Sequence, residues 1–127
     1  MAKILVVDDE FGIGELLREL LGEEGYDVEL AMNGSQGLAK VAQEKPDLIL
    51  LDFMMPVLDG AGMMKRMSAN PDISTIPVIV MSSLPEATIS ARIDGHVAYV
   101  RKPFQIDAII DLVATILAQT GRPPERL

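Results

Sequence analysis

Four groups of polar residues in this sequence each follow a short apolar run, at the position where a strand would end. They are Asp8-Asp9-Glu10, Asp52, Ser82-Ser83 and Lys102-Pro103. Several carboxylates at one edge of a sheet repel one another, so their meeting requires a cation, and hard oxygen ligands suit Mg²⁺. A lysine and a hydroxyl beside them suit an anion with several oxygens. A phosphoryl group between metal and lysine satisfies both demands.

Each of these residues taken alone has a simpler explanation. An isolated Asp or Ser after a strand commonly caps the next helix or ends in a solvated loop. In open parallel sheets, however, ligands bind outside the carboxyl ends of the strands, where helix N-termini and loop amides gather. The coincidence of acidic, hydroxyl and basic groups at four strand ends therefore favours a shared site.

The elements that must position these groups can be identified from the apolar periodicity. Short apolar runs predict strands at 3–7, 27–31, 48–51, 77–81 and 98–101. Apolar residues three and four positions apart predict helices over 13–21, 38–42, 61–69, 86–92 and 106–117. Strands that alternate with helices imply right-handed crossovers and a parallel sheet covered on both faces, an α/β fold.

The overall composition fits one globular domain. The chain has 127 residues, of which 49% are apolar and 24% charged, and no cysteine is present to form a disulfide or thiolate metal site. The formal charge of −8 disfavours direct binding to nucleic acid. No N-terminal apolar run is long enough for a signal peptide or a membrane span, so we expect a cytoplasmic protein with no membrane contact. We assign 1–120 to the domain and 121–127 to a polar tail, either a frayed end or the start of a linker.

Four motifs in order carry a family resemblance that covers essentially the whole chain. ILVVDDE, LILLDFMMPVLDG, PVIVMSS and YVRKPF resemble the receiver domain of bacterial two-component response regulators, in its stand-alone, chemotaxis-regulator-like form. The interval from Asp52 to Ser82 is also usual in that family. The resemblance implies a flavodoxin-like, doubly wound sheet of five parallel strands in the order 2-1-3-4-5, with five helices.

The resemblance also implies a role for each matching acidic residue. Asp52 would accept a phosphoryl group from the phosphohistidine of a sensor histidine kinase or phosphotransfer protein, and become an aspartyl phosphate. Asp9, Asp52 and the backbone carbonyl of Met54 would hold Mg²⁺, for which Mn²⁺ would substitute. Asp8 would act in part through a metal-bound water. The domain would catalyse its own phosphorylation and dephosphorylation without turning over an external substrate.

Three further residues would read and transmit the modification. Lys102 would pair with the phosphoryl oxygens, and the Ser82 hydroxyl would close onto them after transfer. Tyr99 would then turn inward, although a static, half-exposed tyrosine is the alternative. The fourth helix, fifth strand and fifth helix would form the face that binds an unidentified downstream protein. Lys102-Pro103 resembles the family's cis peptide, with an ordinary trans turn as the alternative.

The segment between Ser82 and Lys102 departs from the family pattern. It is shorter than the family norm and contains Pro85 and several poor helix formers, so the fourth helix is where we expect this chain to differ. His96, the only histidine, follows Asp94-Gly95 in a predicted turn and lacks the helical setting of a phosphohistidine domain.

Three other functions remain open from the sequence. The chain could be the receiver part of a larger regulator, or an adaptor that acts without phosphorylation. It could also be a Mg²⁺-dependent phosphatase with an aspartyl nucleophile, but such enzymes place a second Asp two positions after the first. This chain has Met54 there.

Overall fold

The computed structural model describes residues 1–120, so the predicted tail at 121–127 lies outside the described residues. Its five strands form one parallel sheet in the order β2-β1-β3-β4-β5. This is the doubly wound, flavodoxin-like order that the sequence predicts. The strands are β1 (Lys3–Val7), β2 (Asp27–Ala31), β3 (Leu48–Asp52), β4 (Val78–Ser82) and β5 (Ala98–Arg101).

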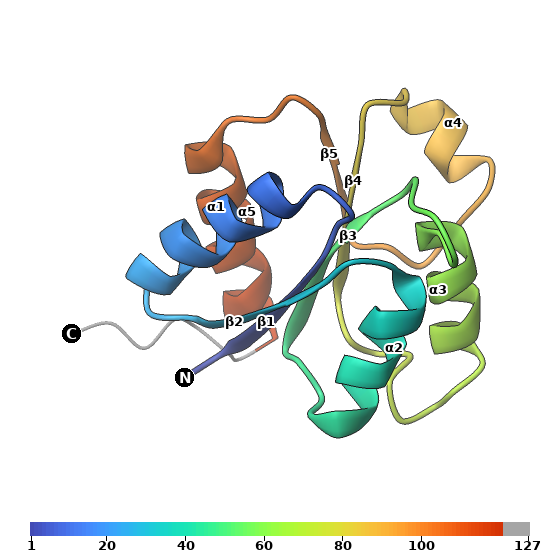
Figure 1. Cartoon of the computed structure of the whole chain (residues 1–127), viewed down its shortest axis with the longest axis horizontal. Coiled ribbons are helices and arrows are strands. Elements are labelled where there is room, and N and C mark those ends of the chain that lie inside the picture. The colour runs from blue at the N-terminus through green and yellow to red at the C-terminus, as the bar shows by residue number, and fades with distance from the viewer. Residues whose placement is uncertain (121–127) are drawn as a thin grey trace.

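Four helices connect the strands and a fifth follows the last strand, and together they cover both faces of the sheet. In Figure 1, α1 and α5 lie on one side of the sheet, and α2 and α3 lie on the other. The same division appears in the packing, because two separate apolar cores form, one on each face. The helices are α1 (Phe11–Glu23), α2 (Gly34–Gln43), α3 (Gly60–Ser68), α4 (Glu86–Ser90) and α5 (Ile106–Gln119).

The three central strands are buried along their whole length. Every residue of β1, β3 and β4 is buried, whereas the edge strands β2 and β5 are only partly covered. A strand packed on both faces has little freedom to move, because its side chains are held by close contacts on each side. The last residue of such a strand is therefore delivered to the sheet edge in a fixed position.

The predicted elements are confirmed in number, type and order, with differences at some faces and ends. Two of the apolar residues whose spacing predicts helices at 13–21 and 38–42 do not face the core. Leu16 on α1 is 44% exposed, and Ala42 on α2 is also exposed. The inner face of α2 is instead formed partly by Gly34 and Gly37, which allow the helix to approach its neighbours closely. Periodicity alone could not show this, since glycine carries no apolar signal.

Helix α4 ends at Ser90 and has only five residues, two fewer than predicted. Thr88 and Ser90 are poor helix formers, and a tight turn follows in which Arg92 N–H donates to the Ile89 carbonyl. Ile89 is the residue of α4 that is buried against the core. The fourth helix is therefore short, in the segment where the sequence predicts a weak helix.

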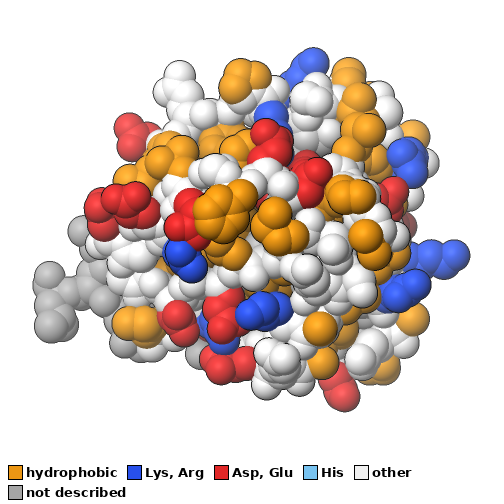
Figure 2. Space-filling model, in the orientation of Figure 1, with side chains coloured by type: hydrophobic (Ala, Val, Ile, Leu, Met, Phe, Trp, Pro, Cys, Tyr) orange, Lys and Arg blue, Asp and Glu red, His pale blue; other side chains and the backbone are white. Residues whose placement is uncertain are grey.

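The surface is mixed in charge. Figure 2 shows acidic, basic and hydrophobic side chains interspersed over one face, with Lys and Arg in separate groups. Within residues 1–120, no helix combines the length and apolar character needed to cross a membrane.

Candidate functional site

The carboxyl ends of β1, β3, β4 and β5 meet around one hollow. Its volume is about 270 Å³, and it is lined by acidic, hydroxyl and basic side chains from four separate segments of the chain. These residues are Asp9, Glu10, Asp52, Met54, Ser82, Ser83 and Lys102. The four polar strand ends identified in the sequence thus meet at one place, here called the carboxylate pocket.

Asp8 adjoins this pocket, because its side chain contacts the lining residue Lys102. It is the first residue after β1, and its backbone N–H donates to the Ala31 carbonyl, 3.0 Å away, at the end of β2. One carboxylate oxygen, Oδ1, accepts a hydrogen bond from the Glu10 N–H at 2.9 Å. The other, Oδ2, accepts from Lys102 Nζ at 2.9 Å. Both oxygens of this buried carboxylate are therefore fixed in direction.

Asp52 ends the buried strand β3 and is itself buried. Its Oδ1 lies 3.5 Å from Lys102 Nζ. Burial, and next the negative charge of Asp8, raise the pKa of Asp52 to about 7, although the charge of Lys102 acts in the opposite direction. An added cation would favour the ionised form of this carboxylate.

Lys102 is the ammonium group that the three neighbouring carboxylates share. Besides Asp8 and Asp52, its Nζ contacts Glu10 Oε1 at 3.2 Å. Burial lowers the pKa of Lys102, but the hydrogen bond with Asp8 and the charges of Asp52 and Asp8 outweigh burial and raise the pKa above its usual value. Its backbone N–H donates to the Ser82 carbonyl at 2.8 Å, and the Lys102-Pro103 peptide is cis, as the resemblance implied.

Ser82 and Tyr99 are linked through the loop that follows β4. The buried Ser82 Oγ accepts a hydrogen bond from the Leu84 N–H at 3.0 Å. The Tyr99 hydroxyl donates to the Leu84 carbonyl and lies 3.4 Å from the Ser82 carbonyl. The tyrosine ring is thus directed toward this loop, and Ser82 and Tyr99 bind opposite ends of Leu84.

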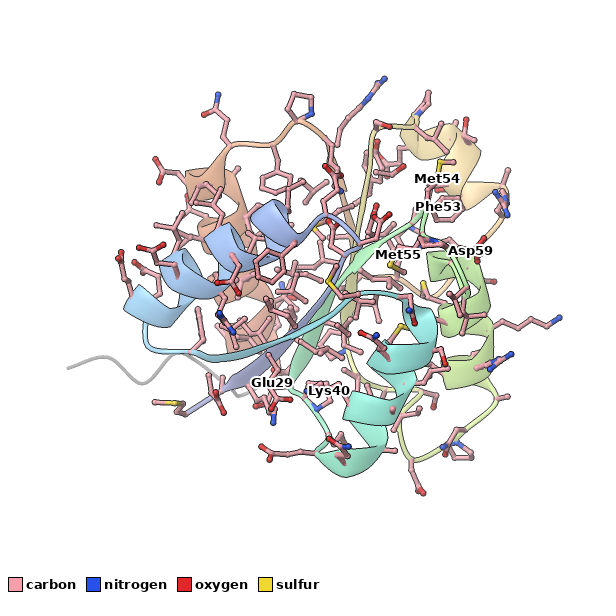
Figure 3. The ribbon with its side chains drawn as sticks, in the orientation of Figure 1. Glu29, Lys40, Phe53, Met54, Met55 and Asp59 are labelled. Carbon is pink, nitrogen blue, oxygen red and sulfur yellow. The ribbon has the colours of Figure 1, made fainter. Side chains whose placement is uncertain are left out.

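The loop after Asp52 is held close to the strand end. In Figure 3, the labelled residues Phe53, Met54 and Met55 lie on this loop. Gly60 N–H donates to the Phe53 carbonyl at 2.9 Å. A Cβ at Gly60 would lie 2.7 Å from the Asp52 carbonyl oxygen, so glycine is required for this close approach.

The pocket contains nearly all of the residues predicted from sequence. Asp9, Asp52, Met54, Ser82 and Lys102 line it, Asp8 contacts the lining residue Lys102, and Tyr99 on β5 contacts the adjoining loop through its hydroxyl. His96 is not among the lining residues. Among residues 1–120, the carboxylates that converge within 4.8 Å of one another belong to Asp8, Glu10 and Asp52. Asp9 also lines the pocket, and its predicted role as a metal ligand stays a prediction. Glu10 has no role in the family resemblance, although its place directly after Asp8-Asp9 is a visible signal.

Comparison with known proteins identifies the family. The family model of the response regulator receiver domain matches residues 4–114. The chain belongs to this family. The receiver domain is 41% identical to the sporulation initiation phosphotransferase F of Bacillus subtilis over 117 residues, which cover 91% of this chain and 93% of that protein.

Two further relatives differ in how much of their length is matched. The DNA-binding dual master transcriptional regulator RpaA of Synechocystis is 34% identical over 98% of this receiver domain, but the chain spans only 53% of RpaA. The solved receiver domain of a signal transduction histidine kinase from Syntrophus aciditrophicus superimposes with a TM-score of 0.88 at 28% identity. That match covers 100% of this chain and 98% of the other.

The donor set of the receiver domain fits a divalent cation. Three carboxylates with oxygens within 4.8 Å of one another face a single ammonium group, so negative charge exceeds positive charge at this place. Carboxylate oxygens are the ligands that Mg²⁺ prefers, and one or two of them suffice because Mg²⁺ retains several waters.

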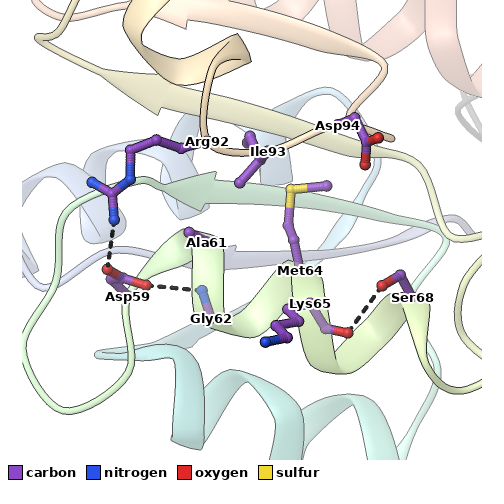
Figure 4. A pocket seen from close by; sticks show the side chains of 9 residues that line it. All are labelled: Asp59, Ala61, Gly62, Met64, Lys65, Ser68, Arg92, Ile93 and Asp94. Carbon is purple, nitrogen blue, oxygen red and sulfur yellow. Dashed lines mark hydrogen bonds and ion pairs between the residues drawn. The ribbon is translucent and has the colours of Figure 1, made fainter.

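Two other hollows lie on the receiver domain, and one of them adjoins the carboxylate pocket. An apolar hollow of about 450 Å³, lined by Ile13, Leu16 and Phe104 among others, shares Glu10 and Lys102 with the carboxylate pocket. A third, of about 440 Å³, lies between α3 and the segment after α4 (Figure 4). There Arg92 Nη2 is 3.9 Å from Asp59 Oδ2, and the Asp59 Oδ1 caps α3 through the Gly62 N–H at 2.8 Å.

Proposed function

We propose that this receiver domain accepts a phosphoryl group on Asp52 from the phosphohistidine of a sensor kinase or phosphotransfer protein, in a Mg²⁺-dependent reaction. The observation that carries the proposal is the convergence of Asp8, Asp52 and Lys102 in one pocket. In the transfer, an Asp52 oxygen forms a bond to phosphorus as the phosphorus–nitrogen bond of the donor breaks. The imidazole leaves with the electron pair of that bond and takes a proton.

The residues of the pocket supply alignment and charge, which are the main requirements of phosphoryl transfer. Asp52 is fixed by its buried strand and must be ionised to attack. Lys102 is within 3.5 Å of Asp52 and can follow the developing charge on the phosphoryl oxygens. Bound Mg²⁺ would supply further positive charge there, and Asp8, Asp52 and Asp9, with the Met54 carbonyl, are the ligands we propose for it.

The donor protein must sit at the rim of the carboxylate pocket, because its phosphohistidine has to reach Asp52. The apolar hollow that includes Ile13, Leu16 and Phe104 shares Lys102 with this pocket. Leu16 and Phe11 are among the few large apolar side chains that are exposed on the described residues. We therefore propose the adjacent face of α1 as the donor contact.

The output would leave through the face formed by α4, β5 and α5. Tyr99, on β5, contacts the loop that also holds Ser82, so closure of the Ser82 hydroxyl onto a phosphoryl group would break the bond to the Leu84 N–H. Such a change shifts a population between two arrangements of the loop. A downstream protein that distinguishes the arrangements would read the signal.

Two further expectations belong to the same proposal. The net charge of −8 supports a domain that binds proteins and does not itself bind nucleic acid, which a mobility-shift titration with duplex DNA would test. We also expect a cytoplasmic location, because the proposed kinase or phosphotransfer protein would deliver its phosphoryl group there. Cell fractionation would test this expectation.

The central test is phosphorylation by acetyl phosphate, followed by intact-protein mass spectrometry. The parent should gain one phosphoryl group when Mg²⁺ is present and none when EDTA removes it. Asp52→Asn should gain none. The control is Asp72→Asn, which removes an exposed carboxylate outside the pocket and should be phosphorylated as the parent is. Equal modification of the Asp52→Asn protein would rule out the proposed acceptor.

The donor contact needs its own test. Leu16→Ser should leave the rate with acetyl phosphate unchanged and slow transfer from a panel of phosphorylated histidine kinases of the same organism. An equal loss with both donors would show that the variant damages the pocket and not the donor contact.

A further inference from the structure

We propose that Glu10 is a positioning residue for Lys102, and that it keeps the ammonium group over the pocket when a metal ion takes the other two carboxylates. The inference rests on the proposed phosphoryl transfer at Asp52. Glu10 would touch neither the phosphoryl group nor the metal. Its effect would pass through Lys102.

The three carboxylates around Lys102 Nζ differ in how exposed their side chains are. Asp8 Oδ2, Glu10 Oε1 and Asp52 Oδ1 lie 2.9, 3.2 and 3.5 Å from this nitrogen. The side chains of Asp8 and Asp52 are 0% and 8% exposed, whereas that of Glu10 is 61% exposed. Asp8 and Asp52 therefore hold the ammonium from the floor of the pocket, and Glu10 holds it from the rim.

Metal loading changes the partners of Lys102 unequally. A divalent cation on the buried carboxylates would draw their charge toward itself and repel the ammonium group. Glu10 is one of the three carboxylates that converge within 4.8 Å among residues 1–120, but its side chain is the exposed one. We therefore assign the cation to the buried carboxylates and leave Glu10 as the partner of Lys102. Without it, the long lysine side chain would gain outward rotamers and spend less time near the phosphoryl oxygens.

The backbone of Glu10 is held firmly enough to direct its side chain. Its N–H donates to Asp8 Oδ1 at 2.9 Å. Its carbonyl accepts from the N–H groups of Ile13 and Gly14, each at 3.1 Å, at the start of α1. Glu10 also lines both the carboxylate pocket and the apolar hollow, so it stands on the wall between them. This is the wall past which the donor would approach.

The test compares Glu10→Gln with Glu19→Gln, which removes the same charge from an exposed position on α1. The rate of phosphorylation by acetyl phosphate with saturating Mg²⁺ should fall about fivefold in Glu10→Gln, a size that a partly exposed ion pair supports. It should be unchanged in Glu19→Gln and partly restored in Glu10→Asp. Affinity for Mn²⁺, measured by electron paramagnetic resonance, should stay within about twofold of the parent. An unchanged rate in Glu10→Gln would overturn the proposal.

Dependence on Lys102 separates positioning from other roles. In a Lys102→Ala background, Glu10→Gln should cause no further loss of rate, because its target is already gone. A further loss of the same size, or a tenfold weaker affinity for Mn²⁺, would show that Glu10 acts on the metal or the pocket directly. The NMR signal of the Lys102 ammonium in the Mg²⁺-loaded protein should also shift and broaden in Glu10→Gln, and an unaltered signal would contradict the proposal.

Failure of the two proposals can be told apart. If the parent accepts no phosphoryl group at all, the proposed function is wrong. The ammonium signal and the Mn²⁺ affinity still report whether Glu10 holds Lys102.

Discussion

The Tyr99 hydroxyl donates a hydrogen bond to the Leu84 carbonyl, which joins the edge strand β5 to the loop after β4. The N–H of the same residue, Leu84, donates to Ser82 Oγ. One loop residue thus connects the Ser82 hydroxyl, beside the proposed acceptor, with the Tyr99 side chain on the proposed output face. This link supplies a physical basis for transmitting a change at Asp52 to a partner-binding surface.

Tyr99→Phe should uncouple the loop from β5 while leaving the chemistry at Asp52 intact. Loss of the hydroxyl removes one hydrogen bond, so the free energy of unfolding should fall by about 1 kcal/mol. Phosphorylation by acetyl phosphate should keep its rate, and amide exchange over residues 83–88 should become faster. Tyr26→Phe, at the other tyrosine, should leave exchange in this loop unchanged. If amide exchange in this loop is also unchanged in Tyr99→Phe, the hydroxyl does not hold the loop.

Gly60→Ala should destabilise the domain and disturb the acceptor. The new Cβ would meet the Asp52 carbonyl oxygen at 2.7 Å and the Phe53 Cα at 2.9 Å, both backbone atoms that cannot move aside cheaply. We expect a loss of roughly 1 to 3 kcal/mol in urea unfolding followed by circular dichroism. Gly12→Ala is the matched control, since a Cβ there meets nothing within 4 Å and should stabilise α1 by about 0.5 to 1 kcal/mol. Equal effects of the two substitutions would contradict the close approach at Gly60.

Asp52→Asn should stabilise the metal-free domain, and more so as the pH rises. The folded-state pKa of Asp52, about 7, lies above the unfolded value near 4, so the folded state binds the extra proton. The stability of the parent should therefore fall as the pH rises from about 4 to about 7, and the amide cannot titrate. One pKa unit corresponds to about 1.4 kcal/mol, so the advantage of Asp52→Asn should grow across this window by roughly 2 to 4 kcal/mol. Unfolding in EDTA from pH 4 to 8 measures it, with Asp72→Asn as control, and a constant difference would show that the pKa is not raised.

Mg²⁺ should raise the stability of the parent, because a ligand that binds only the folded state adds RT ln(1 + [Mg²⁺]/Kd) to the free energy of unfolding. Asp8→Asn should lose most of this gain, since it removes one of the converging carboxylates. Asp47→Asn, at the opposite end of β3 from Asp52, should retain the gain in stability. Thermal unfolding with increasing Mg²⁺ measures the effect, and a full gain in Asp8→Asn would exclude Asp8 from the metal site.

Arg92→Ala should loosen the segment after α4. The Arg92 guanidinium lies 5.0 Å from the centroid of the Phe53 ring, next to the acceptor, and near Asp59 at the start of α3. Losing the contact should lower the free energy of unfolding by about 0.5 to 1 kcal/mol and speed amide exchange over residues 86–93. Arg66→Ala, on the exposed side of α3, should do neither. Parent-like exchange in Arg92→Ala would show that the ring contact does not hold this segment.

The sequence by itself determined the order of elements and most of the pocket. Continuous apolar runs marked the buried central strands, and a parallel sheet brings all strand ends to one edge. Asp52, Ser82 and Lys102 could therefore be placed together before any coordinates, because each stands at or just past the end of a strand. Local pattern suffices where a residue's position follows from the element that carries it.

Only the tertiary structure decided which side chains touch. The contact of Glu10 with Lys102, the bond from Tyr99 to Leu84 and the stacking of Arg92 on Phe53 join segments far apart in the chain. The exposure of Leu16 and the early end of α4 also depend on what packs against each helix. Periodicity records which face of an element is apolar, whereas the distance between two side chains on different elements is set by how those elements pack.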